Sequence, residues 1–431
     1  YVGFSAQEVT VGSQNTINVV LISSNELDEV LVTGYGSQAQ KEITSAVVSV
    51  SEDEFNKGAI TDASELLQGK VAGLSIYNRG GDPNAGTVIR LRGLTTIGAN
   101  TSPLIVVDGV IGASLQNVDP QDIESINVLK DASAAAIYGS RGSSGVLLVT
   151  TKKGVAGETQ LSYNGRFESS TIANQIDVMS PSEFVANGGR DLGSQTDWLD
   201  AVTREGFSQI HNLTASGGAG NSTYRVSANF TEDQGILENS GFDQFNTRLS
   251  FQTSALNDRL KIGFSAAFIQ RNQENGFRES MRYATLYNPT APIYAVDAPY
   301  AFNGAQFGGY FETLGLFDSY NPVSIINQNI NDGEVRTINY GINLEYDLTD
   351  SITAYFRSST QSNDYANRVY FRTTSLWNNN DGYGGADSPV RKGAAEFYEQ
   401  NSDFQLNELY ATWKKSTDNM NLAVTAGYSY Q

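Results

Sequence analysis

The feature that most constrains the fold is a regular alternation of apolar and polar side chains, which begins at about residue 158. In the segment 336–346 every second residue is apolar, namely Ile338, Tyr340, Ile342, Leu344 and Tyr346. Segments 222–230 and 422–430 alternate in the same way. Because successive side chains of a β-strand point to opposite faces, each segment predicts a strand with one apolar and one polar face.

About nine such segments follow one another, each of a length that crosses a membrane when tilted. They cover 159–167, 208–216, 222–230, 243–253, 260–270, 336–346, 351–359, 402–413 and 422–430. Some are separated by short polar turns, such as 348–351, and others by long stretches, 272–333 and 363–395. Short turns on one side and long loops on the other are typical of outer-membrane barrels.

A soluble β-sandwich also alternates, so the side chains themselves must distinguish the two architectures. The chain contains 42 Gly, 22 Tyr and 20 Phe, and the aromatic residues often lie near strand ends. Membrane interfaces favour such amphipathic rings. The polar faces carry charges such as Arg225 and Glu345, which suit a hydrated lumen. These features favour a membrane barrel over a sandwich.

Composition excludes several classes of function. The 431 residues have a formal net charge of -19, and such an acidic surface repels nucleic acids. There is no cysteine and His211 is the only histidine, so thiolate chemistry and histidine-rich metal sites are excluded. We find no nucleophile–base pair and expect neither an enzyme nor a cofactor or metal. The chain begins at Tyr1, and we interpret it as a mature, incomplete product.

The first 154 residues have a different character. Residues 1–24 predict two short strands, which we interpret as the end of a small β-sandwich. Residues 43–154 predict a mixed α/β domain of short apolar strands. Two short helices are expected within it, Asp62–Leu67 with Asp62 as its cap, and the alanine-rich Asp131–Ile137.

Three segments in this region carry a resemblance to a known family. They are LLQGKVAGLSIYNRGGDPNAGTVIRLRGLTTIG (66–98), SPLIVVDGV (102–110) and VDPQDIESINVLKDASAAAIYGSRGSSGVLLVTTKKG (118–154). In this order they resemble the plug domain of the SusC/RagA family of TonB-dependent transporters. LDEVLVTGYG (27–36) is similar to the TonB box of that family, and YVGFSAQEVTV (1–11) to the end of its carboxypeptidase-regulatory-like domain.

The resemblance implies a mainly β fold: a transmembrane antiparallel β-barrel of about 22 strands in the outer membrane, with an α/β plug in its lumen. It divides the chain into 1–25, the end of the regulatory-like sandwich; 26–39, the TonB box and linker; 40–155, the plug; and 156–431, the first part of the barrel. Nine strands cannot close such a barrel, so we expect 159–167 and 420–430 not to pair with each other. We also expect an intact mass above 46.6 kDa.

The family also implies a function, which is energised import of an oligosaccharide or oligopeptide across the outer membrane. The TonB–ExbB–ExbD complex would supply energy by gripping an extended segment through strand addition. The residues expected to bind TonB are Leu27, Asp28, Glu29, Val30, Leu31, Val32 and Thr33. A SusD-like surface lipoprotein would cap the barrel. The alternatives are a surface-binding or secretion-associated protein on the same scaffold, and a passive porin, which a plug would block.

The expected substrate floor is formed by two polar plug loops, 78–86 and 94–102. Its candidate residues are Asn78, Arg79, Asp82, Asn84, Thr95, Thr96, Asn100 and Thr101. By comparison with the family, the plug arginines Arg90, Arg92 and Arg141 are expected to form ion pairs that hold the plug to the barrel.

Three further motifs have simpler interpretations. The G-x-G-x-x-A pattern at 34–39, with Asp53 and Glu54 downstream, suggests a dinucleotide site, but alternating residues 43–50 follow it instead of a helix. Asp119, Asp122 and Glu124 could be mistaken for an acid/base or metal cluster, but residues 119–122 are more simply a turn and helix cap. Residues 378–382 have some likeness to a calcium loop but lack the required acid, so we expect a solvated loop.

Overall fold

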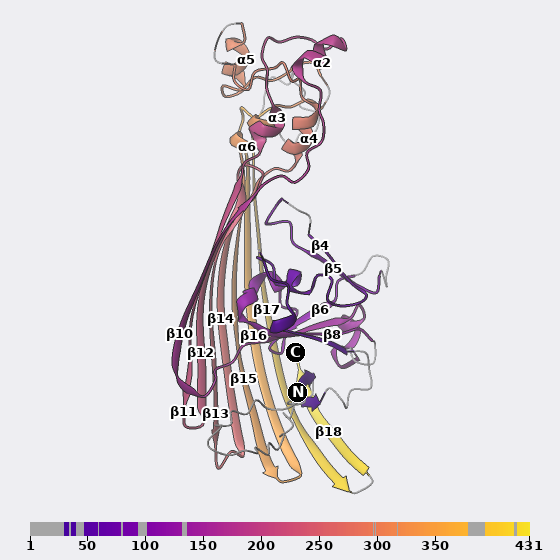
Figure 1. The fold of residues 1–431 in the computed structure, drawn as a ribbon, viewed down its shortest axis with the longest axis vertical. Coiled ribbons are helices and arrows are strands. Elements are labelled where there is room, and N and C mark those ends of the chain that lie inside the picture. Colours follow the sequence, from indigo (N-terminus) through magenta and orange to yellow (C-terminus); the bar gives the residue numbers. More distant parts are fainter. Residues whose placement is uncertain are drawn as a thin grey trace, which may run out of the picture.

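The computed structural model describes residues 30–33, 36–39, 47–58, 60–78, 81–93, 101–131, 136–295, 297, 299–316, 318–377, 393–417 and 420–431. In these residues a tall wall of long strands stands beside a compact domain, with short helices above the wall (Figure 1). Within the same residues, no helix is both long and apolar enough to span a bilayer. The expected sandwich remnant at 1–25 lies outside the described residues.

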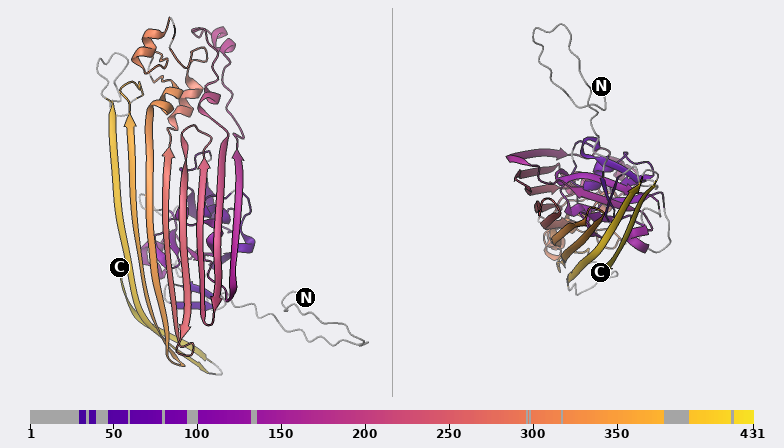
Figure 2. Two further views of the ribbon diagram at one scale, coloured as in Figure 1. Left: turned by 90° about the vertical axis from the view of Figure 1, so that its left-hand side faces the viewer. Right: turned by 90° about the horizontal axis from the view of Figure 1, so that it is seen from below.

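The wall is one antiparallel sheet of nine strands in consecutive order, β10 to β18, as expected from the alternating segments. Figure 2 shows it face-on. Its strands are β10 Gly157–Ser170, β11 Gly206–Ala219, β12 Ser222–Gln234, β13 Ser240–Ala255, β14 Leu260–Asn275, β15 Asn329–Thr349, β16 Ile352–Phe371, β17 Ala394–Thr417 and β18 Met420–Tyr430. Among the described residues, β10 pairs only with β11 and β18 only with β17, so these two strands do not pair with each other, as expected.

The strands are longer than the alternation alone indicates. β15, β16 and β17 contain 21, 20 and 24 residues, whereas a tilted membrane strand needs about 9–11. The expectation of a loop throughout 363–395 is therefore wrong, because 363–371 and 394–395 belong to β16 and β17. Outward positions at the end of β16 interrupt the alternation, because the charged Asp364 and Arg368 stand among Ala366 and Tyr370.

Side chains of β15 confirm the predicted division of faces. Ile338 and Tyr340 point outward and are 48% and 51% exposed. Thr337 is buried, and its hydroxyl accepts a hydrogen bond from Asn117 of the compact domain at 3.1 Å. Odd-numbered residues of this strand therefore face the lumen, and even-numbered residues face the surroundings.

This orientation makes a paired prediction on β15. A lysine in place of Ile342 would put a charge on the outward apolar face and is expected to destabilise the barrel by roughly 2–4 kcal/mol. Lysine in place of the adjacent Asn343 points into the lumen and should have a much smaller effect. Denaturant midpoints of the full-length protein folded in lipid vesicles measure both changes, and equal tolerance at the two positions would contradict the assignment.

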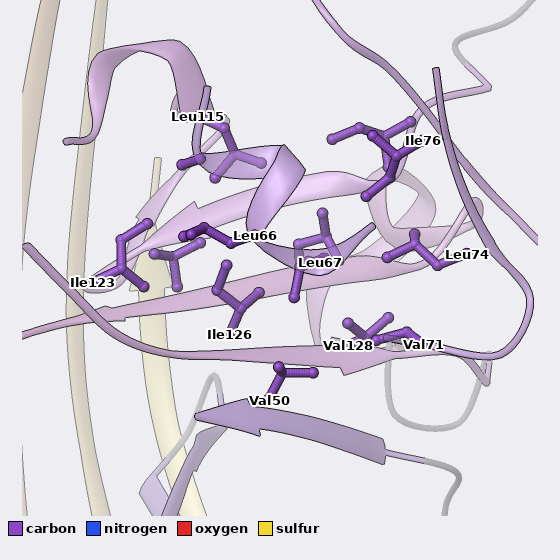
Figure 3. Close-up of a cluster of buried hydrophobic side chains, with 14 of the residues drawn as sticks. Val50, Leu66, Leu67, Val71, Leu74, Ile76, Leu115, Ile123, Ile126 and Val128 are labelled. Carbon is purple, nitrogen blue, oxygen red and sulfur yellow. The ribbon is translucent and has the colours of Figure 1, made fainter. Parts of the chain in front are cut away.

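The compact domain is built on a five-stranded mixed sheet in the order β3-β8-β9-β6-β7. The strands are β3 Val47–Ser51, β6 Leu104–Val107, β7 Val110–Ile111, β8 Ile123–Leu129 and β9 Val146–Thr151, and a separate hairpin joins β4 Leu74–Tyr77 to β5 Val88–Leu91. Buried side chains such as Val50, Ile126 and Val128 form the main core with Leu66, Leu67 and Leu115 from short helical turns (Figure 3). A second, smaller cluster contains Val106, Leu129, Tyr138, Val146 and Leu148. The domain lies against the inner face of the wall (Figures 1 and 2).

The helical turns of this domain are 3-10 segments, η2 Glu52–Glu54, η3 Ala63–Leu67, η4 Leu115–Asn117, η5 Pro120–Asp122 and η6 Ala136–Gly142. The carboxylate of Asp62 accepts a hydrogen bond from the Ser64 amide, and that of Asp119 accepts one from the Gln121 amide, each at 2.8 Å. Both predicted caps are therefore confirmed. The alanine-rich segment falls mostly outside the described residues; only its end lies in η6.

Helices from the long connections pack into a cap above the wall (Figure 1). They are α2 Pro181–Ala186, α3 Trp198–Val202, α4 Glu279–Leu286, α5 Ala301–Gln306 and α6 Pro322–Gln328. Trp198 of α3 packs edge-on against Tyr287 at the end of α4, with ring centroids 4.9 Å apart, and its indole nitrogen donates to the Asn288 carbonyl. The cap thus has its own small core, which keeps the upper ends of the strands in place.

Before the plug-like domain, the strands β1 Val30–Thr33 and β2 Gly36–Ala39 form a two-stranded sheet of their own. The G-x-G-x-x-A pattern thus leads into a strand and not into a helix. A dinucleotide site needs a helix N-terminus at these glycines, so the pattern does not form a dinucleotide site. Because β1 and β2 pair only with each other among the described residues, their hairpin is marginally stable at best.

Candidate functional site

One contact between the compact domain and the wall is centred on Asp122. This carboxylate is 3% exposed and accepts three hydrogen bonds from the inward face of β12. The donors are Arg225 at 3.0 Å, Ser227 at 2.7 Å and Asn229 at 3.0 Å. They lie at every second position of one strand, which places all three side chains on the same face.

A second acid of the compact domain has a similar partner on β13. Asp108 accepts hydrogen bonds from the amide and hydroxyl of Thr151, at 2.9 and 2.7 Å, and pairs with Arg248 at 2.6 Å. Arg225 on β12 and Arg248 on the neighbouring β13 therefore each bind one carboxylate of the compact domain. Charge-assisted bonds of this kind are shorter and stronger than neutral ones.

The polarity of these contacts corrects the prediction made for the plug arginines. Arg90 donates to the Ser102 hydroxyl and its neighbour's carbonyl, and Arg92 pairs with Asp131 inside the same domain. Arg141 does reach the wall, but it donates to the neutral side chain of Gln431. Among the described residues, none of the three forms the expected ion pair with the wall. In the contacts at Asp108 and Asp122 the wall supplies the cations and the compact domain supplies the anions.

Higher up, the loop at 81–86 is bound to the wall by three side chains. Asp82 pairs with Arg278 at 2.5 Å. The amide nitrogen of Asn84 donates to the carbonyls of Gly241 and Glu274, at 2.6 and 2.8 Å. Arg271 donates back to the Asn84 side chain at 3.1 Å and to the Pro83 carbonyl at 3.2 Å. Two predicted substrate-floor residues are thus engaged with the wall.

A hollow of about 360 Å³ lies beside this contact, beneath the cap. Asp82 and Asn84 of the compact domain line one side of the hollow. Arg278, Asn331 and Trp377 line the other side, from the wall and its connections. Chain segments nearly 300 residues apart in sequence therefore meet in one depression. A ligand that enters from the cap side would touch both the inner domain and the wall.

The remaining predicted residues are distributed as follows. Asn78 donates to Glu65 at 2.5 Å, and Thr101 is partly exposed. Arg79, Thr95, Thr96 and Asn100 lie outside the described residues, as do Leu27, Asp28, Glu29 and the loop 378–382. Val30, Leu31, Val32 and Thr33 form β1. Their expected contacts with substrate or TonB stay predictions.

Asp119 is an unusual acid at the lower contact. It is 6% exposed, and burial together with the neighbouring Asp122 raises its pKa to about 7. It lines a second hollow, of about 370 Å³, between the compact domain and strands β10 to β12. Within the described residues no group of three or more histidine, cysteine or acidic side chains could hold a metal ion.

The raised pKa makes the stability of this domain depend on pH. Asp119 titrates at 3.8 in a model peptide and at about 7 when folded, so the folded state binds more protons between these values. Stability should fall as pH rises through this window. Asp119→Asn keeps a capping residue without the charge, and calorimetry should show it unfolding at a higher temperature above about pH 7, with no gain below about pH 4. An unchanged pH profile would contradict this.

Comparison with known proteins agrees with this arrangement. Residues 39–146 match the TonB-dependent Receptor Plug Domain family. The chain is 37% identical over 337 residues to the TonB-dependent receptor SusC of Bacteroides thetaiotaomicron, covering 73% of this chain and 33% of that protein. It is 33% identical over 452 residues to the TonB-dependent receptor P3 of Formosa agariphila, covering 100% of this chain and 43% of that protein. The chain thus spans less than half of these relatives.

Solved structures with the same fold include a RagAB peptide importer in an open-open state, with a TM-score of 0.76 and 20% identity over 93% of this chain and 48% of that one. The siderophore receptor PirA from Acinetobacter baumannii gives 0.51 and 16%, covering 89% of this chain and 47% of that one. Wall and inner domain therefore define a plugged β-barrel receptor of the outer membrane. The chain belongs to the SusC/RagA family of TonB-dependent receptors.

Proposed function

We propose that this chain forms the plug and first strands of a transporter that imports an oligosaccharide or oligopeptide across the outer membrane, with energy supplied through TonB. The observation that carries the proposal is the plug itself, which is held inside the wall by Asp122 and Asp108. A filled lumen blocks passive flow, so passage requires the plug to move. Buried charge-assisted contacts make that movement costly, which calls for an external source of energy.

The segment preceding the plug suits a point of attachment. β1 pairs only with β2 in the described residues, and this hairpin is not joined to either large sheet. A partner that adds a strand could bind β1 through main-chain hydrogen bonds without breaking the plug core. We assign this role to TonB, acting with ExbB and ExbD, at residues 27–33.

We further propose that a SusD-like lipoprotein covers the cap and retains substrate above the plug. The cap has apolar side chains in water, including Phe302, 83% exposed, and Leu316, 64% exposed. Exposed apolar residues of this size are common where proteins associate. One of the matching structures is described as a RagAB peptide importer, which supports an importer as the class of protein.

The proposal is tested by separating binding from uptake. Cells that carry the full-length protein are given labelled substrate before and after a protonophore collapses the inner-membrane gradient. Energised import predicts that uptake stops while surface binding persists. Continued uptake would indicate a passive porin, and binding without uptake in energised cells would indicate a surface-binding protein; either result would overturn the proposal.

A further inference from the structure

The hollow beneath the cap has one apolar side. Phe277, Phe371 and Trp377 line it and pack on one another, with Trp377 edge-on to both phenylalanines at centroid distances of 5.3 and 5.7 Å. Both phenylalanines are buried, whereas Trp377 is partly exposed. The phenylalanines therefore hold the indole at the surface of the depression, where it presents an apolar face beside polar groups.

The other sides of the hollow are rich in hydrogen-bonding groups. The oxygen of Asn275 and the amide nitrogen of Asn331 have no partner among the described residues and can bond a ligand, whereas the amide of Asn84 is already engaged with the wall. Glu279 and Glu396 are exposed and add carboxylates, which accept hydrogen bonds from hydroxyl groups. An aromatic face next to amides and carboxylates matches a sugar ring, which has C–H groups on its faces and hydroxyls around its edge.

Charge in the hollow disfavours acidic ligands. Among the described lining residues the ionised side chains are Asp82, Glu279, Glu396 and Arg278, three acids and one base. The base is already paired with Asp82 at 2.5 Å. An incoming carboxylate or sulfate would meet a net negative surface without a free cation, so neutral ligands are favoured over anionic ones.

Main-chain pairing bears on whether a peptide could bind here. Extended peptides commonly bind by adding a strand to a free sheet edge. Val369 lies on β16, which is paired on both sides, but the pairing of β15 with β14 ends at Asp332, and Glu396 lies in the part of β17 that pairs with β16 alone among the described residues. The preference for a glycan therefore comes from the aromatic face and the polar groups around it, and the peptide probe described below tests it.

We propose that this hollow is a binding subsite for a neutral glycosyl unit, with Trp377 stacking on the ring and the side chains of Asn275, Asn331 and the two glutamates bonding its hydroxyls. The proposal rests on the import function proposed above and narrows its substrate from glycan or peptide to neutral glycan. The bound unit touches Asp82 and Asn84 of the plug as well as the wall, so the subsite lies where the plug meets the substrate side of the lumen.

Binding to the purified full-length protein tests the assignment without requiring transport. Isothermal titration uses maltohexaose, cellohexaose and mannohexaose as neutral probes, an oligogalacturonate as the acidic probe and a casein digest as the peptide probe. At least one neutral oligosaccharide should bind, and Trp377→Ala should weaken it by about tenfold or more, as expected for loss of an aromatic anchor. The acidic and peptide probes should not be affected by this substitution.

Trp413→Ala is the matched control. Trp413 lies on β17 with 39% of its surface exposed, away from the lining of the hollow, so its removal should leave affinity unchanged. Binding by none of the neutral probes, binding that ignores Trp377→Ala, or peptide binding that Trp377→Ala weakens would each overturn the subsite. Energised uptake that persists in those cases would leave the import function standing, so the two failures are distinguishable.

Discussion

Deleting Asp28–Thr33 should abolish uptake while leaving substrate binding at the outer surface intact. The outer membrane has no energy source of its own, so the pull must reach the plug through the chain that precedes it. β1 contains the described part of this segment, and it pairs only with β2 among the described residues. Removing it therefore removes the attachment point without touching the plug core. Uptake assays with labelled substrate, in cells with equal surface levels of both proteins, measure the loss.

Two substitutions in β1 separate main-chain gripping from side-chain recognition. Val32→Pro removes a backbone N–H and should impair uptake strongly if TonB adds as a strand. Val32→Thr keeps both the N–H and the β propensity and should transport almost normally. Normal uptake after the deletion would refute transport by pulling, and equal effects of proline and threonine would refute strand addition.

Arg225→Ala should destabilise the plug within the barrel by roughly 3–5 kcal/mol, because it leaves a buried carboxylate without its cation. The side chains of Arg225 and Asp122 are only 14% and 4% exposed, so water cannot replace the lost partner. Ser227 and Asn229 remain as donors but are neutral. Hydrogen exchange of the β8 amides, at fixed pH in the full-length protein, measures the free energy of plug opening.

Arg92→Ala is the control for this experiment. It removes an arginine from an ion pair of 2.5 Å, shorter than the 3.0 Å between Arg225 and Asp122, but the partners are 51% and 33% exposed. Exposed pairs contribute about 0–1 kcal/mol, so β8 exchange should hardly change. Similar small effects in both variants would mean that the buried contact does not hold the plug, and the proposed energetic need for TonB would weaken.

The wall could be predicted from sequence because its signal is local. Alternation at Ile338, Tyr340 and Tyr346 identified both the strand and its outward face, and a short turn places β16 next to β15. The upper ends were missed because outward positions there are polar, as at Glu334 and Arg336, which pair with each other at 2.5 Å. On β15 the outward positions 332, 334 and 336 are all charged, so the alternation of apolar and polar residues ends there.

The plug contacts could not be predicted in the same way, because they depend on how two separately folded parts meet. Asp119 was correctly read as a cap, but nothing local distinguishes Asp122, three residues later, as the residue that β12 binds. One signal was available: β12, β13 and β14 each carry an inward arginine, Arg225, Arg248 and Arg271. Three cations in a row on the polar face of neighbouring strands indicate an anionic surface opposite.

The hollow was the least predictable part of the site. Its lining comes from loop 81–86, the start of the connection after β14, the ends of β14 to β17, and Trp377 after β16. Only Asp82 and Asn84 were singled out from sequence, and both owe their position to wall residues such as Arg278 and Glu274. Trp377 lies outside any alternating segment, so its sequence context gave no signal. Its position is set by aromatic packing on Phe277 and Phe371.

The length of the central strands has a consequence for how the protein tolerates mutation. At roughly 3.3 Å per residue, β17 with its 24 residues extends for about 80 Å, far more than a bilayer core requires. Exhaustive mutagenesis should therefore show that tolerance of charged residues at outward positions changes part-way along single strands. On β15, outward sites from 338 to 346 should reject charge, whereas outward sites at 332, 334 and 336 should accept it freely. The boundary between the two regimes would mark the level of the outer leaflet directly on the sequence.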